Sequence, residues 1–121
     1  MIPELKHIIE TDAIILFEEL YQTYNVEVPI QLVTPDDIKK VQEMMGRTKN
    51  EYAYLNAMFT GLCIIVKNEN DVKKKKELIT KRDLYERYTK EVKFRYDVLS
   101  RMLSAKMAEN EELKMTGTGG L

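Results

Sequence analysis

The sequence predicts an all-α protein built around a long antiparallel helical hairpin. Apolar residues make up 44% and charged residues 32% of its 121 residues, a composition typical of folded helical proteins. Residues 34–108 contain one proline and two glycines, so few residues there would interrupt a helix. Apolar residues also recur through this region at helical spacing. Together these observations favour two long helices joined by a short turn.

Residues 3–25 are predicted to form a shorter N-terminal helix. Apolar residues recur there at spacings of three and four, as expected for one helix face. They are Leu5, Ile9, Ala13, Leu16, Leu20 and Tyr24.

Residues 26–33 read VEVPIQLV and alternate in the manner of an extended chain. Pro29 cannot lie in the middle of a sheet because it lacks an amide hydrogen. An extended linker over the core is therefore expected, and the alternative is an edge strand that pairs with another copy of the chain.

The first arm of the hairpin is predicted at residues 34–67. Thr34 suits the N-cap, Pro35 suits the first helical position, and the two aspartates that follow suit the positive end of the helix dipole. A heptad-like apolar seam follows at alternating spacings of three and four. Its members are Ile38, Val41, Met45, Thr48, Tyr52, Leu55, Phe59, Leu62 and Val66.

The second arm is predicted at residues 72–108, after a polar turn at residues 67–71. Its apolar stripe consists of Leu78, Tyr85, Tyr88, Val92, Tyr96, Leu99, Leu103 and Met107. Residues 109–121 read ENEELKMTGTGGL and are expected to form a flexible tail. The prediction is thus one helical domain over residues 1–108 followed by that tail.

Helix lengths predict where the N-terminal helix lies. At 1.5 Å per residue it spans roughly 33 Å, against roughly 46 Å and 55 Å for the two arms. The linker reaches about 27 Å at most, so we expect this helix near the open end of the hairpin, away from the turn. The apolar seam nearer the turn would then lack a cover, which predicts a homo-oligomer. The candidate seam residues are Tyr52, Leu55, Phe59, Leu62, Val66, Leu78 and Tyr85.

Charge is distributed unevenly although the net charge is only −1. Residues 1–35 carry one base and six acids, whereas residues 71–108 carry twelve bases and six acids. Five acid-to-base pairs at i, i+4 explain much of this basic segment as a salt-bridged solvent face. They are Glu77–Lys81, Asp83–Arg87, Glu86–Lys90, Glu91–Arg95 and Asp97–Arg101.

Four consecutive lysines in the first turn of the second arm are not explained by these pairs, because a positive charge there opposes the helix dipole. One interpretation is a solvated turn. The other is a cationic prong that binds nucleic-acid phosphate or an acidic protein surface, including the acidic N-terminal segment. The candidate anion-binding residues are Lys73, Lys74, Lys75, Lys76, Lys81, Arg82 and Arg87.

Several function classes lack the residues they need. His7 is the only histidine and Cys63 the only cysteine, so no catalytic triad or cysteine metal cluster is expected. Cys63 is expected to be a buried, inert thiol. We expect no enzyme, cofactor, metal or small-molecule substrate. With no long apolar run, no membrane span is expected either, and the default location is the cytoplasm.

Two hypotheses remain. The first is a non-catalytic, homo-oligomeric helical hairpin that acts in assembly or protein–protein interaction. The alternative is a sequence-independent nucleic-acid-binding protein that uses the basic turn and arm. Small helical hairpins of this kind occur among tailed-phage proteins, such as packaging subunits and recombination mediators, which is an analogy of organisation without a residue-level match.

Overall fold

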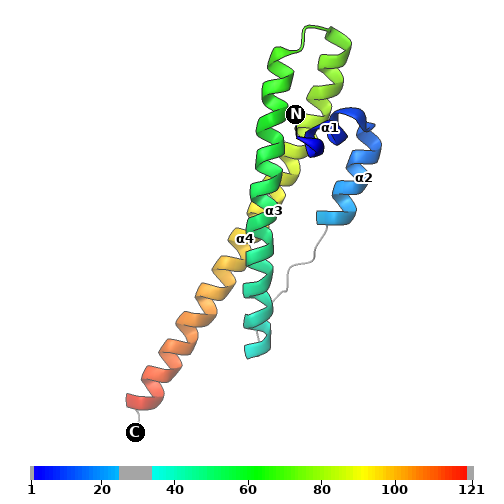
Figure 1. Cartoon of the computed structure of the whole chain (residues 1–121). Coiled ribbons are helices and arrows are strands. Elements are labelled where there is room, and N and C mark those ends of the chain that lie inside the picture. The colour runs from blue at the N-terminus through cyan, green and yellow to red at the C-terminus, as the bar shows by residue number, and fades with distance from the viewer. Residues whose placement is uncertain (1, 25–33, 120–121) are drawn as a thin grey trace.

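The computed structural model describes residues 2–24 and 34–119, and the side chains up to residue 111. Four helices follow one another: α1 (Pro3–Glu10), α2 (Ala13–Tyr24), α3 (Pro35–Asn68) and α4 (Val72–Gly119) (Figure 1). Within the described residues there is no strand, which confirms the all-α prediction. The linker predicted at residues 26–33 lies outside the described residues.

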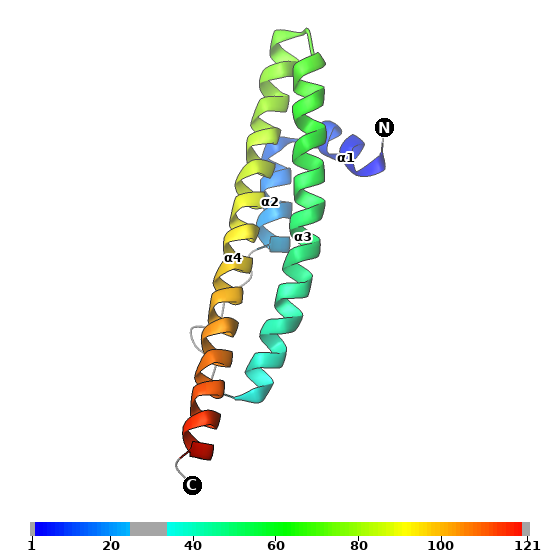
Figure 2. The same cartoon turned by 90° about the vertical axis from the view of Figure 1, so that its left-hand side faces the viewer.

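The two long helices form the predicted antiparallel hairpin and pack together along α3 (Figure 2). Thr34 and Asp37 form a capping box at the start of α3. The Thr34 hydroxyl accepts a hydrogen bond from the Asp37 amide at 3.2 Å, and the Asp37 carboxylate accepts one from the Thr34 amide at 2.9 Å. Asp71 opens α4 by accepting a hydrogen bond from the Lys74 amide at 3.0 Å. Both arms therefore start where a side chain satisfies otherwise unpaired amides.

The N-terminal segment is two helices, so the prediction of one continuous helix over residues 3–25 is wrong. Thr11 ends α1 in an extended conformation, and its hydroxyl donates to the His7 carbonyl. The Asp12 carboxylate then accepts a hydrogen bond from the Ile14 amide at 2.9 Å. These side-chain bonds replace the main-chain bonds of a continuous helix, as threonine and aspartate commonly do.

The position predicted for the N-terminal segment is also wrong. We call the turn between α3 and α4 the tip, and the start of α3 together with the facing part of α4 the open end. α1 and α2 lie beside the tip-side and middle parts of the hairpin (Figures 1 and 2). Leu5 packs against Gly61, and Tyr24 packs against Tyr88. The length of the linker limits only the distance between the end of α2 and Thr34. The rest of the N-terminal segment is therefore free to extend towards the tip.

The main core therefore lies where α1 and α2 cover the hairpin. Its buried residues are Ile8, Leu16, Leu20, Tyr24, Leu55, Met58, Leu62, Tyr85, Tyr88 and Val92. A second, smaller cluster lies towards the open end, where Val41 and Leu99 are buried. The part of the apolar seam that α1 and α2 leave uncovered is thus near the open end, opposite to the prediction.

The second arm is longer than predicted. α4 continues to Gly119, so the helix end predicted near residue 108 is wrong. Residues 109–115 are rich in glutamate, leucine, lysine and methionine, which are good helix formers, and Lys106 pairs with Glu109 at 3.6 Å. α3 has 34 residues and α4 has 48, so the end of α4 projects beyond α3 (Figures 1 and 2). The mobility expected of residues 109–121 stays a prediction.

Candidate interaction surfaces

The lysine run lies at the tip, in the first turn of α4. Lys73, Lys74 and Lys76 are exposed, and Lys75 is half-buried. None of these four takes part in an ion pair with the described residues. Asp71 caps the same helix end and offsets part of the repulsion between the lysines and the helix dipole.

The predicted extension of this cationic patch along α4 is not continuous. Lys81 is only 7% exposed, and its Nζ donates a hydrogen bond to the Ile9 carbonyl at 2.7 Å, so it is not available to an anion. Arg82 pairs with Asp83 at 3.1 Å. Arg87 is exposed and pairs with a glutamate of α4 at 3.6 Å. The candidate anion-binding residues therefore separate into the tip lysines and two isolated arginines.

Two cations of α4 attach the N-terminal helices to the hairpin. The Lys81 ammonium binds a carbonyl in the last turn of α1, and the Arg95 guanidinium donates to the Tyr24 carbonyl at the end of α2. Each cation thus meets the negative end of a helix dipole and satisfies a carbonyl that lacks a partner within its helix. Lys81 and Arg95 lie about four helical turns apart on α4. Part of the basic character of this helix is therefore explained by docking within the chain.

Two of the five predicted i, i+4 pairs are observed on α4. Glu86 and Lys90 are 3.0 Å apart, and Glu91 and Arg95 are 4.0 Å apart. Glu91 also accepts Arg87, a pair of the opposite order. The other three predicted pairs are not among the ion pairs of the described residues: Lys81 binds a carbonyl instead of Glu77, Asp83 pairs with Arg82 instead of Arg87, and Asp97 and Arg101 do not form an ion pair with each other there.

The predicted seam residues pack within the chain. Leu55, Leu62, Val66, Leu78 and Tyr85 are buried, whereas Tyr52 and Phe59 are half-buried. Gly61 lets α1 approach α3, because a Cβ at this position would lie 2.8 Å from Leu5 Cδ1. The seam therefore forms the core, and an oligomer interface has to be sought elsewhere.

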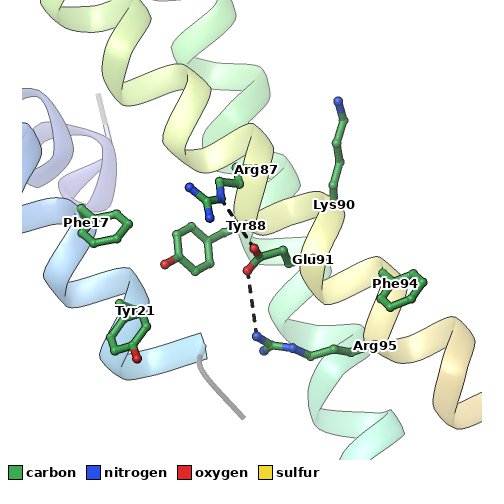
Figure 3. Close-up of a pocket in the computed structure, with 8 residues that line it drawn as sticks. All are labelled: Phe17, Tyr21, Arg87, Tyr88, Lys90, Glu91, Phe94 and Arg95. Atoms are coloured by element: carbon green, nitrogen blue, oxygen red, sulfur yellow. Dashed lines mark ion pairs between the residues drawn. The ribbon is translucent and has the colours of Figure 1, made fainter. Parts of the chain in front are cut away.

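A groove with a volume of about 570 Å³ lies between α2 and α4. We call it the α2–α4 groove. It is lined by Phe17, Tyr21, Arg87, Tyr88, Lys90, Glu91, Phe94 and Arg95. Figure 3 shows the rings of Phe17 and Tyr21 on α2 opposite Tyr88, and Glu91 held between Arg87 and Arg95. One wall is thus aromatic, and the other carries three cations and one carboxylate.

The tyrosines beside and beneath the groove are held in their neutral form. Burial raises the pKa of Tyr24 to about 12, and the nearby Tyr54 and Glu51 act in the same direction. Burial also raises the pKa of Tyr85 and of Tyr88. Removing a phenol from water disfavours the phenolate, so these residues act as apolar packing with a polar tip.

α2 carries a second apolar stripe that its own chain does not cover. Leu16, Leu20 and Tyr24 are buried against the hairpin, but Ile14, Phe17 and Tyr21 are exposed. Across the groove, Phe94 is 68% exposed. The helical periodicity does not mark these exposed residues as candidates, although a signal for Phe94 exists. It lies off the apolar stripe of α4 and between two bases, Lys93 and Arg95.

The residues considered for catalysis are not assembled into a site. His7 is exposed and lies 3.1 Å from Glu19. Cys63 is half-buried, so the prediction that its thiol is buried is wrong. Within the described ranges no group of histidines, cysteines and carboxylates is placed to bind a metal ion. No described helix contains an apolar stretch long enough to cross a bilayer.

Comparisons with known proteins give no relative: no family model, no curated protein and no solved structure matches the chain.

Proposed function

We propose that the chain is a non-catalytic helical-hairpin protein that acts by self-association, as a component of a homo-oligomeric assembly. The observation that supports this most is the width of the apolar surface of α2. Leu16, Leu20 and Tyr24 are buried against the hairpin, whereas the adjacent apolar stripe of Ile14, Phe17 and Tyr21 is exposed. A helix normally buries its apolar face, and here only part of that face meets the rest of the chain.

The exposed face of α2 is unusual for a monomer's surface. Ile14 is 72% exposed and Tyr21 is 52% exposed, and Phe17 lies between them on the same face. Isolated exposed apolar residues need no explanation, but a contiguous stripe marks an interaction site. If another copy of the chain covers this stripe, each Å² of apolar surface removed from water stabilises the association by about 25 cal/mol.

Static light scattering at micromolar concentration tests self-association. We expect an oligomeric mass for the native chain and a monomeric mass for the double variant Ile14→Glu, Tyr21→Glu, because two carboxylates cannot be buried unpaired. Gln22→Glu, at an exposed position on the same helix, is the matched control and should leave the oligomer intact. A monomeric native chain would refute the proposal.

A second candidate function is nucleic-acid binding by the tip, independent of base sequence. It is supported by the exposed Lys73, Lys74 and Lys76, which have no ion-pair partner among the described residues, and by Lys67, exposed in the last turn of α3. Such a cluster attracts phosphates by charge, and the affinity would fall steeply with salt.

Fluorescence anisotropy with labelled single-stranded and duplex DNA at low and moderate salt tests this candidate. Changing Lys73, Lys74, Lys75 and Lys76 to glutamine should abolish binding. A control that removes four exposed lysines elsewhere, Lys39, Lys40, Lys49 and Lys93, should weaken it far less. No binding at low salt, or equal loss in both variants, argues against a binding site at the tip.

A further inference from the structure

We infer that the α2–α4 groove receives the projecting end of α4 from a second copy of the chain, so that copies associate head to tail. This inference rests on the proposed self-association and names the two surfaces that meet. Both surfaces are described above as uncovered within one chain, and their chemistries are complementary.

The groove offers an aromatic wall and a cationic rim. Phe17, Tyr21 and Phe94 supply exposed rings. Arg87 and Lys90 supply exposed cations, which also pair with Glu91 and Glu86 of the same helix. A segment that lies over the groove would place its side chains between α2 and α4. A matching segment needs apolar groups that contact the rings and carboxylates that meet the rim.

The projecting end of α4 has this composition. Met107 is 56% exposed, and its thioether makes favourable contacts with aromatic rings. Glu109 and Glu111 are also exposed, and Glu109 pairs with Lys106. Residues 107–113 contain three glutamates and lie between Lys106 and Lys114. The last turns of α4 continue beyond the start of α3 (Figure 2).

This contact can only form between copies. One wall of the groove and the projecting end belong to the same continuous helix α4, so Met107 cannot fold back onto Phe94 of its own chain. Two different surfaces then meet, which gives a ring if the rotation closes and a filament if it does not. Rim charges would set the register of the contact, and the buried rings and methionine would supply most of the affinity.

Nucleic acid fits the groove less well. A phosphate backbone would pass Glu91 inside the groove, and α2 adds Glu18 and Glu19 beside Phe17. Like charges at short range would repel the strand, whereas a short helical end can place its few glutamates on the rim alone.

Charge reversal tests the inference by light scattering on the full chain. The groove variant Arg87→Glu, Lys90→Glu and the helix-end variant Glu109→Lys, Glu111→Lys should each lower the oligomeric mass to that of the monomer. A chain that combines all four changes should recover the native mass, because the charges are again complementary. Lys39→Glu, Lys40→Glu, at exposed positions near the start of α3, is the matched control and should remain oligomeric. Circular dichroism checks that each variant is helical.

The outcomes separate this inference from the proposed function. An oligomer that resists both reversals but dissociates in the Ile14→Glu, Tyr21→Glu variant keeps self-association and overturns the head-to-tail contact, in favour of a symmetric contact through α2. The head-to-tail contact is also overturned if the groove variant and the helix-end variant are each monomeric and the combined variant does not recover the native mass. The head-to-tail contact is likewise overturned if the native chain binds labelled single-stranded DNA, and this binding is lost in the groove variant but kept in the helix-end variant. A monomeric native chain overturns both.

Discussion

The two halves of the hairpin have the same helices but different covers. Towards the tip, α1 and α2 lie on α3 and α4, and the cluster around Leu55 and Tyr88 is buried beneath them. Towards the open end α3 and α4 pack only on each other among the described helices, and the apolar cluster there buries Val41 and Leu99. The residues packed around that pair are only partly buried: Ile38, Met44, Met45, Met102 and Leu103.

This difference in burial shows that a third helix determines how much of the apolar seam between two helices is removed from water. Two helices share a single line of contact, so the residues that flank that line stay partly solvated. With α2 in place, residues on the flank, such as Tyr88, become buried as well. The same heptad pattern thus yields a tight core in one half and a shallow, methionine-rich contact in the other.

Core truncation gives the largest predicted effect and compares the halves directly. Leu55→Ala should lower the free energy of unfolding by about 3–4 kcal/mol, because it leaves a cavity under α1 and α2. Leu103→Ala at the open end should cost only about 1–2 kcal/mol, since its side chain is already partly hydrated. Urea denaturation followed by circular dichroism measures both, and equal losses would contradict the comparison.

Removing one of the attachments of α1 should have the next largest effect. Lys81→Met should cost about 1.5–3 kcal/mol, because a charge-assisted hydrogen bond is lost and the Ile9 carbonyl keeps no protein partner. Lys93→Met, at an exposed position of the same helix, should have an effect close to zero. Hydrogen exchange should show lost protection in α1 and unchanged protection at the open end. Uniform loss along the hairpin would argue against a local attachment.

Alkaline pH should weaken the covered half. The pKa of Tyr24 is raised from 10.0 to about 12 in the folded chain, so its contribution to stability is complete below pH 10 and lost as the pH rises to about 12. The free energy of unfolding should fall in this window by about 1.4 kcal/mol per pH unit for each such tyrosine. Urea titrations between pH 8 and 12 measure the slope. Tyr24→Phe should reduce it, and an unchanged slope would contradict the role of this residue.

The two helical glycines give the smallest predicted effect. A Cβ added at Gly46 would meet no described side chain within 4 Å, so Gly46→Ala should stabilise the chain by about 0.5–1 kcal/mol through helix propensity. Gly61→Ala should gain less, because Leu5 has to move aside. Comparing denaturation midpoints measures the difference, and a larger gain at Gly61 would show that α1 is not held closely against α3.

The hairpin could be predicted from the sequence because its signals are local and repeated. Thr34 and Asp37 are two reciprocal capping residues. The seam repeats over four heptads, so one position that departs from the apolar pattern does not change the prediction of a helix. The break at Thr11 and Asp12 could not be read in the same way. Both residues are compatible with a helix face, and only their hydrogen bonds to His7 and Ile14 end one helix and begin the next.

The placement of the N-terminal helices could not be predicted because it depends on main-chain acceptors. Lys81 and Arg95 bind carbonyl oxygens, and every residue has a carbonyl, so no sequence pattern marks the partner. For the same reason the sequence does not distinguish Lys81 from the exposed tip lysines. The α2–α4 groove depends on that placement, and it therefore could not be assembled from residue patterns alone.

Attachment through main-chain oxygens has a consequence for how this protein can vary. Substitutions at positions 9 and 24 leave the main-chain carbonyl oxygens in place, so these two contacts should tolerate a change of side chain there. The number of residues between Lys81 and Arg95 should not change, because inserting or deleting one residue rotates one cation by about 100° around α4 relative to the other. Among natural or engineered versions of the chain, the length of that interval should be preserved more strictly than the residues at either carbonyl.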